Sequence, residues 1–269
     1  MRLFTLNKLG ILAAVVLAAL LFLIGMQSYY GVGRGMPGPQ EGLRPAGPPP
    51  PLGGARNMLG ISSVVGLMYV LAMLLFLVLA AVSTGYGKAQ KIRLGVYESS
   101  RGVRNVVANG VGPLAFAIIV MVLGLFNLWL LYLGAVVGFL ACVAAITADK
   151  FSSEFGVLDG PPVMIFTGKR VRRGVSGGIT LFGLVAGLAG AIIASILLPL
   201  FFVMLGIPFF WFGVVAVVIG GVVGMVADSM LGFYETKGIG TKHSSNFIAS
   251  IIGGFWGMAL FMLFIIMLH

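Results

Sequence analysis

Long runs of apolar residues separated by short polar segments make up most of the chain. Several runs exceed the roughly 18 residues that distinguish a bilayer span from a buried core helix. The stretch 111–147 would be about 55 Å long as one helix, nearly twice the hydrocarbon thickness, so we expect a turn near Asn127. The run 174–227 carries no charge and must also turn, and Pro199 and Pro208 mark where. The pattern predicts seven spanning helices, near 9–26, 59–83, 111–126, 129–148, 176–198, 208–232 and 247–268.

Composition agrees with an all-α integral membrane protein. The residues are 59% hydrophobic and only 9% charged, which excludes a soluble fold. Glycine occurs 41 times, about twice its usual share, and glycines four residues apart let apolar helices approach closely. Such small-xxx-small faces could also join copies of the chain into an oligomer. The spacing recurs at Gly134/Gly138, Gly183/Gly187, Gly220/Gly224 and Gly253/Gly257.

Basic residues gather in four polar segments. The N-terminus carries two Lys or Arg residues, 84–110 and 149–174 carry five each, and 233–246 carries two, whereas three lie elsewhere. Cytoplasmic loops are enriched in Lys and Arg. We therefore predict a multi-pass protein of the cell membrane with its N-terminus and these segments in the cytoplasm and its C-terminus outside.

The chain divides into three parts. Residues 1–26 are predicted to be an N-terminal membrane anchor helix, because no convincing small-x-small cleavage site follows their apolar run. Residues 27–58 contain most of the prolines, and a Pro/Gly tract cannot bury a core, so we expect an external linker. Residues 59–269 form the predicted six-helix catalytic domain, with cytoplasmic loops 84–110, 149–174 and 233–246.

Cysteine and overall charge restrict the chemistry. The single Cys142 lies in an apolar run, which excludes a disulfide framework and a Cys-based zinc site. The net charge of +10 is dispersed between apolar segments with no soluble domain to carry it. Lipid headgroups or phosphorylated small molecules are therefore the expected partners, and nucleic acid is not.

Three acidic residues lie at predicted span ends. Ionisable groups at membrane depth are costly and are functional candidates. Asp149 and Glu154 diverge by about 140° on a regular helix, so a shared metal would need a bend or a helix end between them. The alternative is that Asp149 ends a helix while Lys150 and Glu154 form an exposed ion pair. Asp228 follows 54 residues without a charge and needs a cation, a metal or a water-filled cleft, unless it lies at a solvated helix end.

Two basic segments flank these acids. Pro161, Pro162 and a Thr167-Gly168 turn between short apolar runs predict a small β-hairpin. Basic residues then lead into the glycine-rich segment 174–178, where backbone amides at a helix N-terminus could hold phosphate. The alternative is a positive-inside cluster on lipid headgroups. These basic residues are Lys169, Arg170, Arg172 and Arg173.

The segment 101–110 has a polar and an apolar stripe at helical spacing, which predicts a helix lying on the membrane surface. Its polar stripe consists of Arg101, Arg104, Asn105 and Asn109. Three basic residues precede it, and we interpret them as lipid headgroup contacts. They are Lys88, Lys91 and Arg93.

Four ordered segments within about 59–268 resemble the integral-membrane family that includes plant phytyl phosphate kinase and the transmembrane-protein-19-like proteins. They are 101–110, with its Val-Val-Ala-Asn-Gly end; 148–156, an Ala-Asp-x-x-x-Ser-Glu-x-Gly pattern; 175–190, with Ser-Gly-Gly and small residues; and 228–232, Asp-Ser-Met-Leu-Gly. Lys150 and Phe151 replace a Thr-Trp-like pair, and Val175 replaces a common Thr, which bears on substrate and nucleotide choice.

The resemblance implies a kinase that transfers the γ-phosphoryl group of CTP or ATP to an isoprenyl monophosphate, such as phytyl, geranylgeranyl or polyprenyl phosphate. It also implies Mg²⁺, with Asp149, Glu154 and Asp228 as catalytic residues and metal ligands. On the same basis, the expected phosphate-binding residues are Arg101, Arg104, Asn109, Lys169, Arg172, Arg173, Ser176, Gly177, Gly178, Ser229 and Asn246.

Two other functions fit parts of the pattern. A cytidylyltransferase that makes a CDP-activated lipid also needs metal-binding acids, a basic face and a lipid phosphate. A lipid-phosphate transporter or flippase would use Asp149 and Asp228 for ion coupling, but the sequence has no obvious inverted repeat of broken helices.

Overall fold

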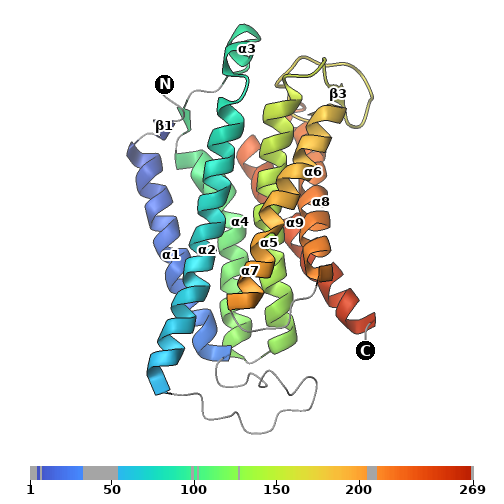
Figure 1. The fold of residues 1–269 in the computed structure, drawn as a ribbon. Coiled ribbons are helices and arrows are strands. Elements are labelled where there is room, and N and C mark those ends of the chain that lie inside the picture. Colours follow the sequence, from blue (N-terminus) through green and yellow to red (C-terminus); the bar gives the residue numbers. More distant parts are fainter. Residues whose placement is uncertain are drawn as a thin grey trace.

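The long apolar runs form helices, because a backbone in hydrocarbon must satisfy its hydrogen bonds internally. This computed structural model describes residues 5–6, 8–32, 54–97, 100–101, 103–126, 128–204 and 211–267. Its long helices run roughly along one axis as a bundle (Figure 1). They are α1 (Lys8–Val32), α2 (Gly54–Gly85), α4 (Val103–Leu125), α5 (Trp129–Gly156), α6 (Leu181–Ser195), α7 (Leu197–Met204), α8 (Trp211–Glu235) and α9 (Lys242–Met267), with a short α3 (Lys88–Arg93).

Six segments of the described chain are long and apolar enough to cross a membrane, and the shorter apolar segment Gly10–Met26 lies within α1. The predicted all-α, multi-pass fold is confirmed. The end of the bundle where α2, α5 and α8 finish and α4 and α9 start is called the basic end below (Figure 1). That this end faces the cytoplasm stays a prediction.

Helices at the basic end are longer than hydropathy predicted. α5 continues beyond Asp149 to Gly156, and α8 continues to Glu235. The prediction of a surface-lying helix at 101–110 is wrong, because the chain from Val103 onward forms the first turns of the spanning helix α4. Asn105 and Asn109 on these turns therefore line cavities between helices of the bundle.

Two connections also differ from the prediction. The expected linker 27–58 overlaps the helical ends of α1 and α2, and its part 33–53 lies outside the described residues. The span expected from 176 begins only at Leu181, because Thr180 is its N-cap and accepts a hydrogen bond from the Gly183 amide at 3.0 Å. The turn expected near Asn127 is confirmed by the break between α4 and α5.

Two pairs of short strands lie at the basic end. β3 (Val163–Met164) pairs antiparallel with β4 (Gly178–Ile179), and a bridge joins Val163 to Arg170. The predicted β-hairpin is confirmed by this arrangement. β1 (Thr5–Leu6) pairs parallel with β2 (Ser100–Arg101), which ties the start of the chain to the segment before α4.

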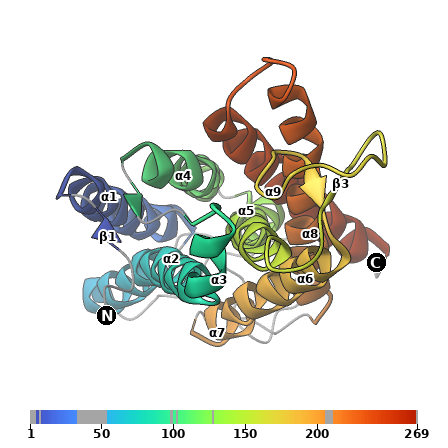
Figure 2. The same cartoon turned by 90° about the horizontal axis from the view of Figure 1, so that it is seen from above.

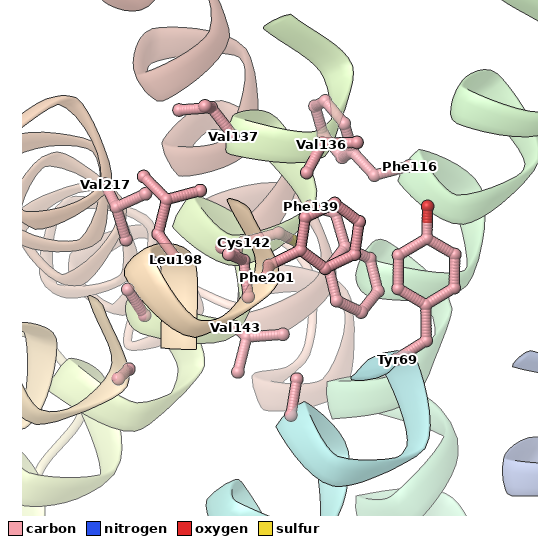
Figure 3. Close-up of a cluster of buried hydrophobic side chains, with 14 of the residues drawn as sticks. Tyr69, Phe116, Val136, Val137, Phe139, Cys142, Val143, Leu198, Phe201 and Val217 are labelled. Atoms are coloured by element: carbon pink, nitrogen blue, oxygen red, sulfur yellow. The ribbon is translucent and has the colours of Figure 1, made fainter. Parts of the chain in front are cut away.

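The central helix of the bundle is α5, which the other long helices surround (Figure 2). Its apolar residues form most of the buried core together with side chains of α2, α4, α7 and α8 (Figure 3). The Phe139 ring lies 4.3 Å from the Tyr69 ring, centroid to centroid, and Cys142 is fully buried beside them. Polar residues at the end of α5 are consequently held by a rigid element.

Small residues bring α8 to backbone contact with α5. A Cβ atom added at Gly220 would lie 2.9 Å from the Ala141 Cβ, and one added at Gly224 would lie 2.4 Å from the Ala145 Cβ. Neither position has room for a larger side chain. Because steps of four residues return to nearly the same helix face, these pairs form a small-residue ladder along the two helices.

The third helix of this contact is α9. A Cβ added at Gly253 would lie 2.7 Å from the Gly220 carbonyl oxygen and 2.9 Å from the Ala145 Cβ. The close approach that we predicted from glycine spacing is therefore confirmed, and the oligomer stays a prediction. All four pairs, Gly134/Gly138, Gly183/Gly187, Gly220/Gly224 and Gly253/Gly257, meet other parts of the same chain.

Replacing Gly224 by valine should destabilise the protein by about 2 kcal/mol, because the added atoms overlap Ala145 and the Ala249 carbonyl oxygen. Recovery of monodisperse, detergent-purified protein after heating measures the loss. Gly160→Val is the control, since a Cβ at Gly160 meets nothing within 4 Å. Equal thermal stability of the two variants would contradict the proposed tight contact between α5 and α8.

Candidate functional site

Two aspartates from different helices meet one step beyond the small-residue ladder. Asp149 lies four residues after Ala145 on α5, and Asp228 lies four residues after Gly224 on α8. Both helices run toward the basic end (Figure 1). The two carboxyl groups therefore come together, and both line one small cavity. The ladder thus sets the position of this aspartate pair.

Two asparagines complete the surroundings of the aspartate pair. Asn109 comes from α4 and Asn246 from α9, and both line a small cavity of about 10 Å³ with the two aspartates. The Asn246 carboxamide lies 3.4 Å from Oδ1 of Asn109. In the amide orientation that satisfies its neighbours, Nδ2 of Asn246 donates to Oδ1 of Asp228 at 3.1 Å and to the Lys242 carbonyl oxygen at 2.9 Å. Four helices therefore supply this site.

The chemistry of the aspartate pair suits a hard cation. Two ionised carboxylates in contact repel, so a proton or a cation must lie between them. Within the described ranges no group of three or more His, Cys, Asp or Glu side chains could hold a metal ion. Mg²⁺ is nevertheless commonly held by one or two carboxylates, with water and substrate phosphates completing an octahedron. The aspartate pair fits that requirement.

A polar cavity of about 370 Å³ opens beside the aspartate pair, and both aspartates line it. This volume lies in the range of small-molecule sites. Lys150, Arg173 and Lys242 contribute positive charge to its wall. The remaining wall includes the glycine-rich segment 174–178 and the polar residues Ser152, Ser153, Thr180, Ser229 and Glu235.

The glycine-rich segment rests directly on α8. Gly177 has a left-handed φ of 78°, and a Cβ there would lie 2.6 Å from the Phe233 amide nitrogen. A Cβ at Gly232 would lie 2.5 Å from the Gly177 nitrogen, so both positions need glycine. We had predicted that this segment lies at the N-terminus of a helix. It is instead a turn that precedes α6. It lies one turn beyond Asp228.

The predicted phosphate-binding residues lie in different places. Arg173, Ser176, Gly177, Gly178 and Ser229 line the polar cavity, whereas Asn109 and Asn246 lie at the aspartate pair. Lys169 and Arg172 are exposed and are not part of the cavity wall. The side chains of Arg101 and Arg104 lie outside the described residues.

Arg173 is oriented by the loop before the hairpin. Its Nη2 donates to the Asp159 carbonyl oxygen at 2.5 Å, while its buried Nε has no hydrogen-bond partner within the described chain. A buried donor without a partner is costly. A phosphate oxygen in the polar cavity would satisfy it.

Glu154, expected as a third metal ligand, lies away from the aspartate pair. Its Oε2 accepts from Lys91 Nζ at 2.7 Å, and its Oε1 accepts from Thr84 Oγ1 at 2.8 Å and pairs with Lys150 Nζ. α5 continues unbroken through Asp149 and Glu154, so the two carboxylates diverge as on any regular helix. Glu154 therefore anchors two lysines beside the polar cavity.

Lys91 is fully buried, which corrects its interpretation as a lipid headgroup contact. Besides Glu154, its Nζ reaches the carbonyl oxygens of Ser83 at 2.8 Å and Thr84 at 3.4 Å, in the last turn of α2. A cation at a helix C-terminus satisfies carbonyls that have no partner within the helix. Lys91 thereby fastens α3 and α2 to α5. The sequence signal for this role is absent, because Lys91 and Glu154 are 63 residues apart.

Comparisons with known proteins agree with the membrane fold. The description "integral membrane protein DUF92" matches residues 54–254. The chain belongs to the DUF92 family. Within it, an uncharacterized membrane protein of Methanocaldococcus jannaschii is similar, with 36% identity over 202 residues that cover 73% of this chain and 77% of that protein. The Asp149, Asp228, Asn109 and Asn246 cluster lies wholly within the part that matches DUF92.

A plant protein gives a more distant match. Protein PGR of Arabidopsis thaliana is 31% identical over 143 residues, which cover 48% of this DUF92 chain and 49% of the plant protein. No solved structure matches the chain.

Removing the Lys91 charge should destabilise the protein by about 3 kcal/mol, because Glu154 loses one of its buried partners and two α2 carbonyls lose their donor. Lys91→Met tests this by thermal unfolding in detergent. Lys88→Met on the same short helix is the control, since the Lys88 Nζ lies over the Tyr97 ring and makes no ion pair within the described part of the chain. A Lys91 variant as stable as the Lys88 variant would contradict the anchoring role.

Gly177→Ala should loosen the hairpin and the glycine-rich turn, because its Cβ overlaps the backbone of α8. We expect the rate of tryptic cleavage after Arg172 or Arg173 to rise roughly tenfold as this region opens locally. Gly174→Ala is a matched control, because it carries the same positive φ but its Cβ meets nothing closer than 3.4 Å. Equal cleavage of both variants would show that backbone strain alone, and not contact with α8, matters.

Proposed function

We propose that this DUF92 protein is a membrane kinase that transfers the γ-phosphoryl group of a nucleoside triphosphate to an isoprenyl monophosphate, giving the diphosphate. One observation carries the proposal: the aspartate pair lines a polar cavity that also contains three basic residues, at the end of a membrane-spanning bundle. A water-soluble nucleotide could reach the cavity from the basic end. A lipid phosphate could reach the pair from the bundle.

The aspartate pair would hold Mg²⁺, with the carboxylates of Asp149 and Asp228 as its ligands. Bound Mg²⁺ supplies charge neutralisation and orientation of the phosphate oxygens. Asn246 fixes the Asp228 carboxylate through its amide hydrogen bond, and Asn109 lines the same small cavity. These asparagines keep the pair in one geometry without adding charge.

The basic residues of the polar cavity would bind the nucleotide phosphates. Arg173 offers its unpartnered Nε, and Lys150 is held at the wall by its ion pair with Glu154. Val175 and Gly178 donate their amides to the carbonyl oxygens of Arg172 and Val175. The other amides of the glycine-rich turn would add neutral donors for phosphate. Together these groups offset much of the charge of a triphosphate in a site of low dielectric constant.

In the proposed step a phosphate oxygen of the isoprenyl monophosphate attacks the γ-phosphorus. The bond from that phosphorus to the β,γ-bridging oxygen breaks, and the nucleoside diphosphate leaves with this oxygen. The isoprenyl diphosphate gains one phosphoryl group, and no redox change occurs. Such a transfer depends mainly on positioning and charge stabilisation, which is what the aspartate pair and the cavity wall offer.

Asp149→Asn and Asp228→Asn should each lower phosphoryl transfer roughly a thousandfold, because each variant halves the charge available to Mg²⁺ while keeping side-chain shape. Asp159→Asn is the control, since Asp159 is exposed and contacts Arg173 through its backbone only. Purified variants are assayed with labelled nucleotide and isoprenyl monophosphate after gel filtration confirms their fold. Wild-type turnover in either pair variant would remove that residue from the proposed metal site.

Product analysis separates the kinase from its rivals. With γ-labelled nucleotide, the label should appear in isoprenyl diphosphate, and CTP and ATP compared side by side identify the donor. A CDP-lipid with release of pyrophosphate would instead establish a cytidylyltransferase. Movement of lipid phosphate across liposomes without nucleotide consumption would establish a transporter.

A further inference from the structure

An apolar pocket of about 250 Å³ lies between α1, α2 and α4, apart from the polar cavity. Ala14 and Ala18 of α1 and Met73 and Phe76 of α2 line it, and almost all of the other lining side chains are apolar too. The lining residues of α2 run from Val70 to Ala80, so the pocket extends about 15 Å along the helix axis. The pocket is therefore elongated and shaped for a chain.

The crossing of α1 and α2 creates this pocket. A Cβ added at Gly25 would lie 2.4 Å from the Gly66 Cα, so the two helices touch through their backbones at that level. Toward the basic end they separate (Figure 1), and small side chains at Ala14 and Ala18 leave the gap open. α1 also closes on α4, where a Cβ at Gly110 would lie 2.3 Å from Leu17. The pocket is thus bounded by fixed contacts.

The polar end of the apolar pocket leads to the aspartate pair. Asn109 lines both the apolar pocket and the small cavity that contains Asp149 and Asp228. The two aspartates in turn line both the small cavity and the polar cavity. The order in space is therefore an apolar pocket, an asparagine, a carboxylate pair and the polar cavity with its basic residues. That order matches an amphiphile with an apolar chain and a phosphate head placed against a nucleotide.

We propose that the pocket between α1, α2 and α4 binds the apolar chain of a single-chain lipid phosphate, with the phosphate held at Asn109 beside the aspartate pair. This inference rests on the proposed function, because it names where that reaction's acceptor lies. Asn105 and Asn109 provide hydrogen-bonding groups only at the head end of the pocket. The phosphate and the nucleotide would approach the pair from opposite sides, as phosphoryl transfer requires.

The test uses the full chain in phosphatidylcholine nanodiscs without nucleotide. The probe is a prenyl monophosphate with a diazirine at the end of its chain, and mass spectrometry locates the labelled residues. Saturable labelling of α1 and α2 at the pocket, reduced by unlabelled prenyl monophosphate but not by prenyl alcohol, is the expected result. Labelling that does not saturate, or that spreads over exposed faces of the bundle, would show that the pocket holds only bilayer lipid and would overturn the proposal.

Ala18→Phe should reduce saturable labelling roughly tenfold by filling the pocket. Ala19→Phe carries the same change on the exposed side of α1 outside the pocket lining, so it should label like the wild type. Equal labelling of the two variants would contradict the proposal. Probes of increasing chain length on the wild type give a test that needs no variant: affinity should rise until the chain fills about 15 Å and then level off.

The kinase proposal and the lipid-pocket proposal can be rejected independently of each other. Saturable pocket labelling without transfer from any of the four nucleoside triphosphates would reject the kinase and keep the lipid site. Phosphoryl transfer with unchanged KM for the lipid in Ala18→Phe would keep the kinase and reject the pocket.

Discussion

The distance between α5 and α8 decides where Asp228 lies, and the candidate site depends on it. Hydrocarbon does not drive apolar helices together, so close contact in a membrane comes from small residues that let backbones approach. Gly224 against Ala145 is such a contact, because a Cβ added at Gly224 would lie only 2.4 Å from the Ala145 Cβ. One helical step further, the same two faces carry Asp228 and Asp149. Close packing therefore places two carboxylates together in spite of their mutual repulsion.

The charged groups around the basic end have two separate tasks. The buried cluster of Lys91, Glu154 and Thr84 fastens α2 and α3 to α5, and its charges are paired. Lys150, Arg173 and Lys242 instead face the polar cavity. Lys150 belongs to both groups, since its ion pair with Glu154 holds it at the cavity wall. A metal at the aspartate pair and phosphates in the cavity would complete the charge balance of this end.

Sequence patterns predicted the helices well, because length and hydropathy alone decide what can span a bilayer. Asp228 stood out because it interrupts a charge-free run, and it lies on the α8 face that the Gly220/Gly224 spacing marked. The α5 face that it meets carries Ala141 and Ala145 and had no glycine signal. The meeting itself could not be derived, since it depends on how α5 and α8 are rotated about their axes. Helical spacing placed Asn109 in a polar stripe, but its phosphate-binding role and that of Asn246 came only from the family resemblance. The ion pair of Glu154 with Lys150 was the alternative that the sequence offered, and the structure contains it, although it is partly buried. The second partner, Lys91, was missed because it is remote in sequence and lies on a helix of six residues.

Hydropathy also made the predicted spans of α4 and α5 too short at the basic end. Polar residues such as Asp149 and Asn109 ended the predicted spans, yet both lie within helices because neighbouring helices supply their partners. The apolar pocket had no sequence signal at all, as it follows from where α1 crosses α2 and α4. Which segments can span a membrane is thus readable from composition, whereas helix ends depend on neighbouring helices and cavities depend on crossing geometry.

Electron paramagnetic resonance of Mn²⁺ bound together with a non-hydrolysable nucleoside triphosphate tests the central claim most directly, because Mn²⁺ accepts the oxygen ligands that Mg²⁺ prefers. The account predicts a single bound Mn²⁺ in the wild type and in Glu154→Gln, and loss of that ion when Asp149 and Asp228 are both changed to Asn. A bound ion that survives the double change, or that disappears with Glu154→Gln in a folded protein, would contradict it.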